Sequence, residues 1–234
     1  MTSPIDSIPM PVERCLRFAL GNVQGQTIEE VRLAQVGSLR TELHTERWLS
    51  FEATHHVRPA QVAFEWIARV RIAPLVHLRV RDALENGTGS SDLKLWSVLP
   101  VARAGPSPEM NAGSLHRFLA EAAWYPSVLR PSERLHWNAI DDTRARATLD
   151  AHGTSVELEF RFGPRGEITG IFTPARWGRF DGRFRQVAWE GRFADYEEFE
   201  GVVVPRSGEV GWFDGGHWTS TWRGRVVSAH YRFA

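Results

Sequence analysis

Hydrophobic and polar residues alternate along most of this chain, and this alternation predicts a protein built mainly of antiparallel strands. The clearest case is the segment 64–72, FEWIARVRI, in which apolar side chains occupy every second position and charged ones stand between them. Successive side chains of a strand point to opposite faces, so one face packs on a core and the other meets water. Further strands are expected over residues 28–39, 47–57, 75–84, 93–101, 135–140, 144–149, 155–162 and 167–172.

The C-terminal third is harder to divide. Residues 174–186 are rich in arginine, glycine and aromatic residues and show no clear period, and residues 187–234 predict about four short strands. Together these signals indicate a single antiparallel sheet of about ten strands. Because open twisted sheets rarely exceed about ten strands, a sheet of this length must curl or close.

A helix over residues 114–124 interrupts the strand pattern near the middle of the chain. Ser114 is expected to cap its first turn, and Pro126 to end it because proline lacks an amide donor. The apolar stripe has helical spacing and consists of Leu115, Phe118, Leu119 and Ala122. The polar face carries His116, Arg117 and Glu121, and alanine at His116 or Arg117 is expected to cost little stability.

The predicted fold class is therefore mainly β, of the α+β kind. We expect an extended curved antiparallel sheet, either a half-barrel or a closed barrel, with the central helix in or over its concave face. A second, shorter helix is expected near residues 12–20, where Pro11 suits a first turn. Residues 1–11 are expected to form a loose arm, and residues 12–234 a single β-rich domain.

Composition narrows the functional classes. The 28 basic residues balance 28 acidic ones, which argues against a general attraction to nucleic acid or to anionic membranes. The single cysteine excludes an intrachain disulfide. No stretch approaches the roughly 18 apolar residues of a membrane helix, and the N-terminus lacks the basic start of a signal peptide. We expect a cytoplasmic protein without a cofactor, and the oligomeric state stays open.

The usual catalytic motifs are missing from the sequence. Residues that could act as acids or bases concentrate instead at the end of the central helix and in the segment that follows it. A histidine near carboxylates is the common composition of a general acid–base pair. The candidate catalytic residues are His136, Asp141 and Glu121. The alternative is that Asp141 and Asp142 only supply turn chemistry and that His136 faces solvent or packs on Trp137.

Ten tryptophans are spread over nearly every expected element. A rigid aromatic lining with indole donors suits a pocket for a flat or apolar ligand, although the same rings would also fill the core of a wide sheet. The candidate ligand-binding residues are Trp124, Tyr125, Trp137, Trp66 and Arg144. Glu121, Trp124 and Tyr125 are spaced so that they can share one rim of such a pocket.

Residues 174–185, PARWGRFDGRFR, interleave arginine with aromatic side chains. Platforms for single-stranded nucleic acid have this composition, but the acidic residues that follow and the zero net charge argue against it. An arginine cluster that binds one carboxylate or phosphate of a small ligand fits better, and a solvated loop is the simplest interpretation.

Three segments, LAEAAWYPSVLRPS, RLHWNAIDDTRARATL and VELEFRFGPRGEI, resemble a bacterial family known mainly as a domain of unknown function. The resemblance covers most of the chain, and its most specific parts are the WYP elbow and the W-x-A-I-D-D segment. The implied shape is similar to the half-barrels of periplasmic lipoprotein carriers (LolA-like), a fold also used by a cytoplasmic enzyme of pigment biosynthesis. The carriers have an export signal that this sequence lacks, so lipid shuttling is not expected.

Two functions follow as hypotheses. The first is binding of an apolar or aromatic small molecule in a tryptophan-rich half-barrel cavity, with no nucleic-acid partner and no insertion into a membrane. The alternative is a cofactor-free enzyme of isomerase, cyclase or lyase type, in which His136, Asp141 or Glu121 moves a proton in the same cavity. A surface for a protein partner is a third interpretation.

Overall fold

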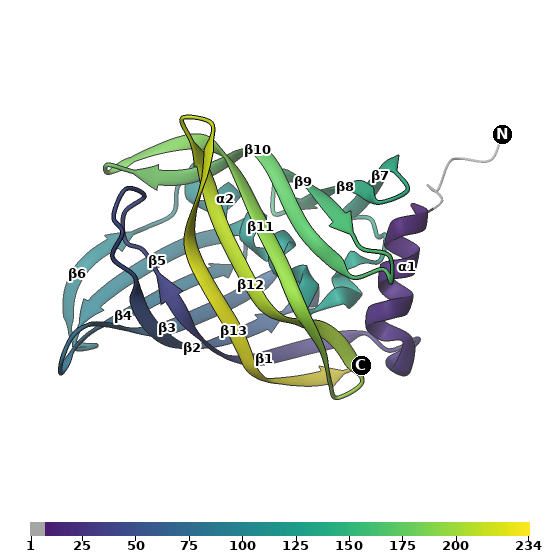
Figure 1. Cartoon of the computed structure of the whole chain (residues 1–234), viewed down its shortest axis with the longest axis horizontal. Coiled ribbons are helices and arrows are strands. Elements are labelled where there is room, and N and C mark those ends of the chain that lie inside the picture. Colours follow the sequence, from purple (N-terminus) through teal and green to yellow (C-terminus); the bar gives the residue numbers. More distant parts are fainter. Residues whose placement is uncertain (1–7) are drawn as a thin grey trace.

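One antiparallel sheet of thirteen strands curls into a half-barrel (Figure 1). This is a computed structural model, and it describes residues 8–234. The first half of the sheet comprises β1 (Ile28–Leu39), β2 (Leu49–Arg58), β3 (Ala63–Ala73), β4 (Val76–Glu85), β5 (Thr88–Leu95) and β6 (Leu99–Ala104). The second half comprises β7 (Leu135–Asp141), β8 (Arg144–Ala151), β9 (Thr154–Phe162), β10 (Ile168–Phe180), β11 (Arg183–Phe199), β12 (Val202–Asp214) and β13 (His217–Phe233).

Each half of the sheet is a meander, and the two halves meet where β1 pairs with β13. Strands β6 and β7 are the two edges of the sheet and do not pair with each other. The predicted curved antiparallel sheet is thus confirmed, and of the two expected shapes the half-barrel is the one observed. The sheet has thirteen strands instead of the ten expected. It curls, as a twisted sheet of this length must, but it does not close into a barrel.

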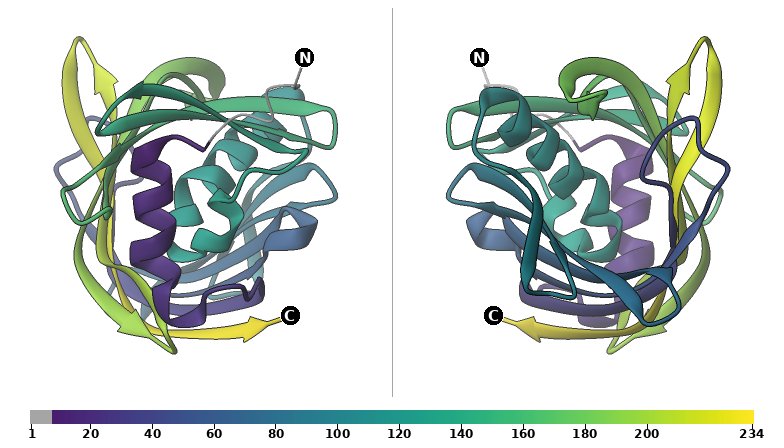
Figure 2. Two further views of the ribbon diagram at one scale, coloured as in Figure 1. Left: turned by 90° about the vertical axis from the view of Figure 1, so that its right-hand side faces the viewer. Right: turned by 90° about the vertical axis from the view of Figure 1, so that its left-hand side faces the viewer.

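The connection from β6 to β7 runs through the hollow of the half-barrel. It consists of α2 (Pro108–Ala120) and the short 3-10 segments η3 (Glu121–Trp124) and η4 (Pro126–Leu129). Figure 2 shows the sheet wrapped around this connection, with α1 (Met10–Leu20) beside it at one end of the hollow. The helix expected in the concave face is therefore confirmed.

Helix α2 begins six residues earlier than the sequence pattern predicts. Ser107 rather than Ser114 is its N-cap, and the Ser107 side chain accepts a hydrogen bond of 3.2 Å from the Met110 amide. Pro108 follows at the first helical position, where its missing amide proton costs nothing. Ser114 is buried within the helix. The helix ends at Ala120, and the 3-10 turn η3 completes the expected run to Trp124.

The C-terminal third contains fewer and longer strands than expected. The unassigned residues 174–180 continue β10, and residues 187–234 belong to three strands instead of four, since β11 and β13 are each 17 residues long. Local irregularities such as the register shift between Thr173 and Arg176 obscure the period of two in the sequence.

The described part of the chain begins just before helix α1. The expected loose arm, residues 1–11, falls mostly outside the described residues, and α1 already begins at Met10. Helix α1 buries Val12, Cys15, Ala19 and Leu20, in agreement with the expected second helix. Within residues 8–234 no helix is long and apolar enough to cross a membrane.

Candidate functional site

A cavity of about 610 Å³ lies between the concave face of the sheet and the C-terminal end of α2. Its walls come from both halves of the sheet, with β3, β4 and β5 on one side and β10 to β13 on the other. Residues 40–44, which connect β1 to β2, also line it. This volume is typical of sites for small organic molecules.

Five tryptophans supply the aromatic part of the wall: Trp66, Trp124, Trp189, Trp212 and Trp222. The indole nitrogen of Trp124 donates 2.8 Å to the Pro205 carbonyl oxygen, and that of Trp66 donates 2.9 Å to the Gln35 side-chain oxygen. The rings of Trp124 and Trp222 meet edge to face at 6.4 Å. These contacts hold the rings in fixed orientations, so the lining is formed before any ligand enters.

A network of charged and polar side chains lies along one wall of the cavity. Arg117 of α2 contacts Asp82 at 2.8 Å and Glu121 at 2.9 Å, and the Ser91 hydroxyl donates 2.6 Å to Asp82. Burial opposes the charge of Arg117, but Glu121 and Asp82 outweigh it and raise the pKa of Arg117 above its ordinary value. Arg117 was expected on a polar helix face and replaceable at little cost, but the structure pairs it with two carboxylates. We now expect its replacement to be destabilising, because both carboxylates would lose their cationic partner.

Glu121 also faces a histidine from the sheet. His55 lies on the inner face of β2 and is 1% exposed, with its Nε2 atom 3.4 Å from Glu121 Oε2. Burial lowers the pKa of His55 to about 4, although the Glu121 charge opposes this shift. Neither ring nitrogen of His55 nor Glu121 Oε2 has a hydrogen bond within the described residues. His56, its neighbour, points outward to Glu30, as the alternation along a strand requires.

Arg176 of β10 lines the opposite side of the cavity. Its guanidinium lies over the rings of Trp189 and Trp212, at 4.3 and 5.2 Å from their centres. Its Nη2 donates 3.1 Å to the Gly113 carbonyl oxygen of α2. Burial, followed by the nearby charge of Arg117, lowers the pKa of Arg176 to about 10. At neutral pH it is a half-buried cation.

The structure brings together three of the residues that the sequence singled out. Trp66, Trp124 and Glu121 all line the cavity. Tyr125 does not share their rim: it is fully buried, and its hydroxyl donates 2.6 Å to the Phe118 carbonyl oxygen. Trp137 lies in another part of the core, where it packs on Phe160 with ring centres 5.3 Å apart.

The other three candidates lie away from the cavity. His136 is exposed on the edge strand β7. Asp141 and Arg144 form an ion pair of 2.8 Å at the β7–β8 turn, and the Thr143 amide, followed by Arg144, lowers the pKa of Asp141 to about 2. The sequence placed these residues near Glu121 because they are close along the chain, but the 3-10 segments and β7 carry them to the outer surface.

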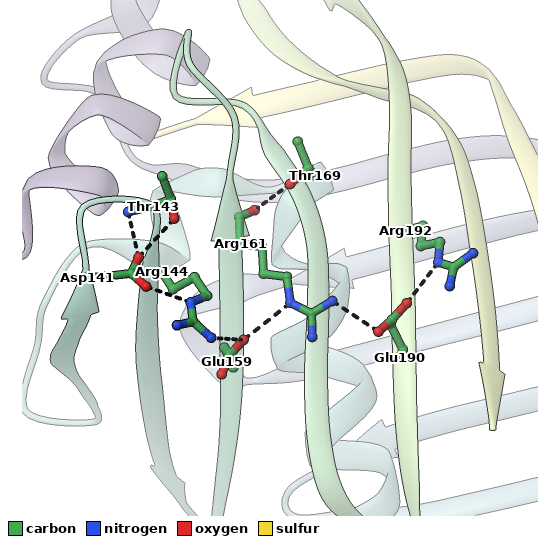
Figure 3. A network of polar contacts seen from close by, with 8 residues as sticks. All are labelled: Asp141, Thr143, Arg144, Glu159, Arg161, Thr169, Glu190 and Arg192. Carbon is green, nitrogen blue, oxygen red and sulfur yellow. Dashed lines mark hydrogen bonds and ion pairs between the residues drawn. The ribbon is translucent and has the colours of Figure 1, made fainter. Parts of the chain in front are cut away.

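Figure 3 shows that Asp141 and Arg144 begin a row of ion pairs across neighbouring strands. Arg144 contacts Glu159 at 3.8 Å, Arg161 joins Glu159 to Glu190 at 3.2 and 3.0 Å, and Arg192 closes the row on Glu190 at 2.8 Å. A Cβ at Gly170 would lie 3.1 Å from the Gly191 carbonyl oxygen, so glycine suits the close approach of β10 to β11 beneath this row. These side chains bind one another and stabilise the outer face of the sheet.

Sequence reasoning missed several cavity residues, namely Asp82, Ser91, Arg117, Arg176, Trp189, Trp212 and Trp222. It also missed His55, which faces Glu121 but does not itself line the cavity. One signal was available for Arg176, which belongs to the arginine and aromatic segment 174–185. The others look like ordinary strand or helix positions. Among residues 8–234, no group of three or more His, Cys, Asp or Glu side chains is placed to hold a metal ion.

Comparison with known proteins gives a family but no activity. A family model described as "Family of unknown function (DUF6544)" matches residues 1–224. No curated protein matches the sequence. Among solved structures, the chain is similar to the LolA superfamily protein NE2245 from Nitrosomonas europaea, with a TM-score of 0.46 and 9% identity over 97% of this chain and 94% of that one.

A second similar structure is a β-barrel-like protein of the domain of unknown function DUF1849 from Brucella abortus. The TM-score is 0.24 and the identity 9%, over 89% of this chain and 100% of that one. The match to a family of unknown function agrees with the family resemblance of the sequence, and the half-barrel is seen in the structure itself. Neither structural similarity assigns a ligand.

Proposed function

This chain belongs to the DUF6544 family, and we propose that it binds an apolar or aromatic small molecule in the cavity between the sheet and α2. The observation that carries the proposal is the combination of a volume of about 610 Å³ with a wall of five tryptophans. A drug-sized organic molecule fits such a volume and would be buried over most of its surface.

The apolar lining is incompletely covered by the protein itself. Leu78, Val80, Val210, Trp212 and Trp222 pack against the core but remain only partly buried. These five positions lie on strands from the two opposing halves of the half-barrel, Leu78 and Val80 on β4 and the other three on β12 and β13, so a molecule between them would cover both walls at once. Each square ångström of apolar surface removed from water contributes about 25 cal/mol, which favours an apolar occupant.

A matched pair of valine substitutions tests this proposal. Val80 of β4 lines the cavity, whereas Val227 of β13 is 50% exposed elsewhere. Val80→Trp fills part of the cavity, and Val227→Trp adds the same side chain outside it. The neutral fluorescent probe N-phenyl-1-naphthylamine should bind the wild type saturably. We expect its affinity to fall at least tenfold in Val80→Trp and to stay within twofold in Val227→Trp.

The outcomes separate clearly in a fluorescence titration. Absence of saturable binding to the folded wild type would refute the proposal and favour a protein-partner surface instead. Equal affinity in the wild type and in Val80→Trp would show that the probe binds somewhere else. Circular dichroism and thermal melts of each variant establish that the comparison is made between folded proteins.

The position of Glu121 favours a second candidate, a cofactor-free enzyme acting in the same cavity. Its carboxylate is held by Arg117 on one oxygen and faces His55 with the other, while lining the space that a ligand would occupy. A carboxylate fixed in this way can take a proton from a bound molecule and return it at another atom. His136 and Asp141 have no part in this candidate because they lie on the outer surface.

Mass spectrometry distinguishes the two candidates. A binding protein returns its ligand unchanged, whereas an isomerase or cyclase exchanges a ligand proton with solvent during turnover. Incubation of a bound ligand in heavy water with wild type and with Glu121→Gln therefore tests proton transfer directly. Deuterium incorporation that depends on Glu121 supports an enzyme, and its absence in a ligand shown to bind supports simple binding.

A further inference from the structure

Arg176 is a half-buried arginine of the cavity wall that has no carboxylate partner within residues 8–234. Arg117 pairs with Asp82 and Glu121, but no ion pair of 4 Å or less engages Arg176. Its Nε atom is buried without a hydrogen bond. A half-buried cation that lacks a counter-ion and has a buried N–H group without a hydrogen bond costs free energy in the empty protein.

The neighbours of Arg176 determine which of its N–H groups are free to bind a ligand. Trp189 and Trp212 stack on the guanidinium, and Gly113 of α2 takes one of its N–H groups. Stacking covers the faces of a guanidinium and leaves the donors in its plane for other partners. Two parallel N–H groups in that plane match the two oxygens of a carboxylate.

The charge of the whole lining agrees with an acidic ligand. Five arginines line the cavity, namely Arg40, Arg117, Arg176, Arg179 and Arg185, against four carboxylates, Glu42, Asp82, Glu121 and Asp181. The lining therefore has one positive charge in excess when its histidine is neutral. One negative charge on a ligand would balance it.

We infer, as an extension of the proposed small-molecule binding, that the ligand is a singly charged carboxylic acid with an apolar body. Its carboxylate pairs with Arg176 between α2 and β10, and its body lies along the aromatic wall toward Trp66 and Trp222. Asp82 and Glu121, the partly buried carboxylates of the lining, are already paired with Arg117, so a cationic ligand would find only the exposed Glu42 and Asp181 as partners. It also gives the apolar cavity a preferred orientation for its occupant.

Displacement of bound N-phenyl-1-naphthylamine by dodecanoate and by dodecan-1-ol tests the inference, because the two compounds share a chain length and differ in the charged group. The wild type should bind dodecanoate at least tenfold more tightly than the alcohol, as a charge-assisted pair in a buried site predicts. Arg176→Met keeps the side-chain length without the charge and should bind the two compounds within threefold of each other. Arg185→Met, at an exposed position that also lines the cavity, is the matched control and should keep the preference.

Salt separates Arg176 from the exposed arginines. Exposed charges are screened at high ionic strength, whereas a buried pair is screened much less. The preference for dodecanoate should therefore persist in 0.5 M NaCl. If Arg176→Met does not fold, the wild-type preference and its salt dependence still decide, and Arg176→Lys, which restores the charge, should recover part of the preference.

The results that overturn this inference differ from those that overturn the proposed function. Binding of the neutral probe without any preference of the wild type for dodecanoate, or with an unchanged preference in Arg176→Met, refutes the acidic ligand alone. Failure of both compounds to displace a bound probe also refutes it. Failure of the probe itself to bind refutes the small-molecule function on which the inference rests.

Discussion

Two buried histidines should make this protein unusually sensitive to mild acid. His55 and His116 are 1% and 6% exposed, and burial lowers the pKa of each from 6.5 to about 4. His116 Nε2 donates 3.3 Å to the Glu157 carbonyl oxygen, while His55 has no hydrogen bond within the described chain. The folded state therefore holds both side chains neutral at a pH where the unfolded chain protonates them.

The sign and size of the effect follow from this difference in proton binding. A folded-state pKa below the unfolded value means that stability is complete above pH 6.5 and is lost as the pH falls toward 4. Each pH unit in this window costs about 1.4 kcal/mol per histidine. Between pH 7 and pH 5 the loss is about 2 kcal/mol for each, or about 4 kcal/mol for both. That is a large part of the 5–15 kcal/mol typical of folded domains.

Urea unfolding at pH 7, 6 and 5, followed by tryptophan fluorescence, measures this loss. His55→Gln and His116→Gln should each remove about 2 kcal/mol of the pH dependence, whatever they do to stability at pH 7. His136→Gln, on the exposed edge strand, controls for the removal of a histidine. A wild-type loss below about 1 kcal/mol, or an unchanged loss in both buried variants, would refute the reasoning.

Two further predictions concern the packing of α2. Phe118 is fully buried and packs on Tyr125, so Phe118→Ala should lower the free energy of unfolding by about 3–5 kcal/mol. The control Val101→Ala, on the exposed edge strand, should change it by less than about 0.5 kcal/mol. Similar losses in the two variants would contradict the packing. A Cβ at Gly89 of β5 would lie 2.7 Å from the Met110 carbonyl oxygen, so Gly89→Ala should lower the melting temperature by several degrees. Gly105→Ala, with nothing within 4 Å, should leave it nearly unchanged, and equal melting temperatures would show that α2 shifts freely.

The fold could be predicted from the sequence because burial repeats along each element. Strand β3 shows this plainly, since its inward residues Phe64, Trp66, Ala68 and Val70 are all buried. The helical stripe of α2 behaves in the same way, and Leu115, Phe118 and Leu119 are buried as expected. Such periodicity depends only on the backbone geometry of a strand or helix, so the curved sheet and its central helix were within reach of the sequence.

The residues at which helices and strands begin and end were harder to predict from the sequence, because neighbouring signals competed. Ser107 and Ser114 both precede helical residues, and the longer apolar stripe drew attention to Ser114. The pair Ser107-Pro108 was the better signal, because it joins a capping hydroxyl to a proline in the first turn. Breaks in the register of β10 hid the long C-terminal strands in a similar way.

The cavity was decided by the tertiary structure. Trp124 and Trp137 look alike in sequence, but Trp124 lines the cavity and Trp137 packs on Phe160 in the core. Arg117 looked like an exposed helix residue until β4 placed Asp82 against it from 35 positions away. Which side of a helix meets solvent depends on what lies opposite, and no local period contains that information.

The sequence by itself determined the fold class, the central helix and a chain rich in tryptophan. Only the tertiary structure decided which tryptophans share a cavity, that Arg176 lies between two of them without a counter-ion, and that Glu121 faces His55 while Asp141 and Arg144 lie outside. The physical reason is that secondary structure follows from neighbours along the chain, whereas a site is formed by strands that the curling of the sheet brings together.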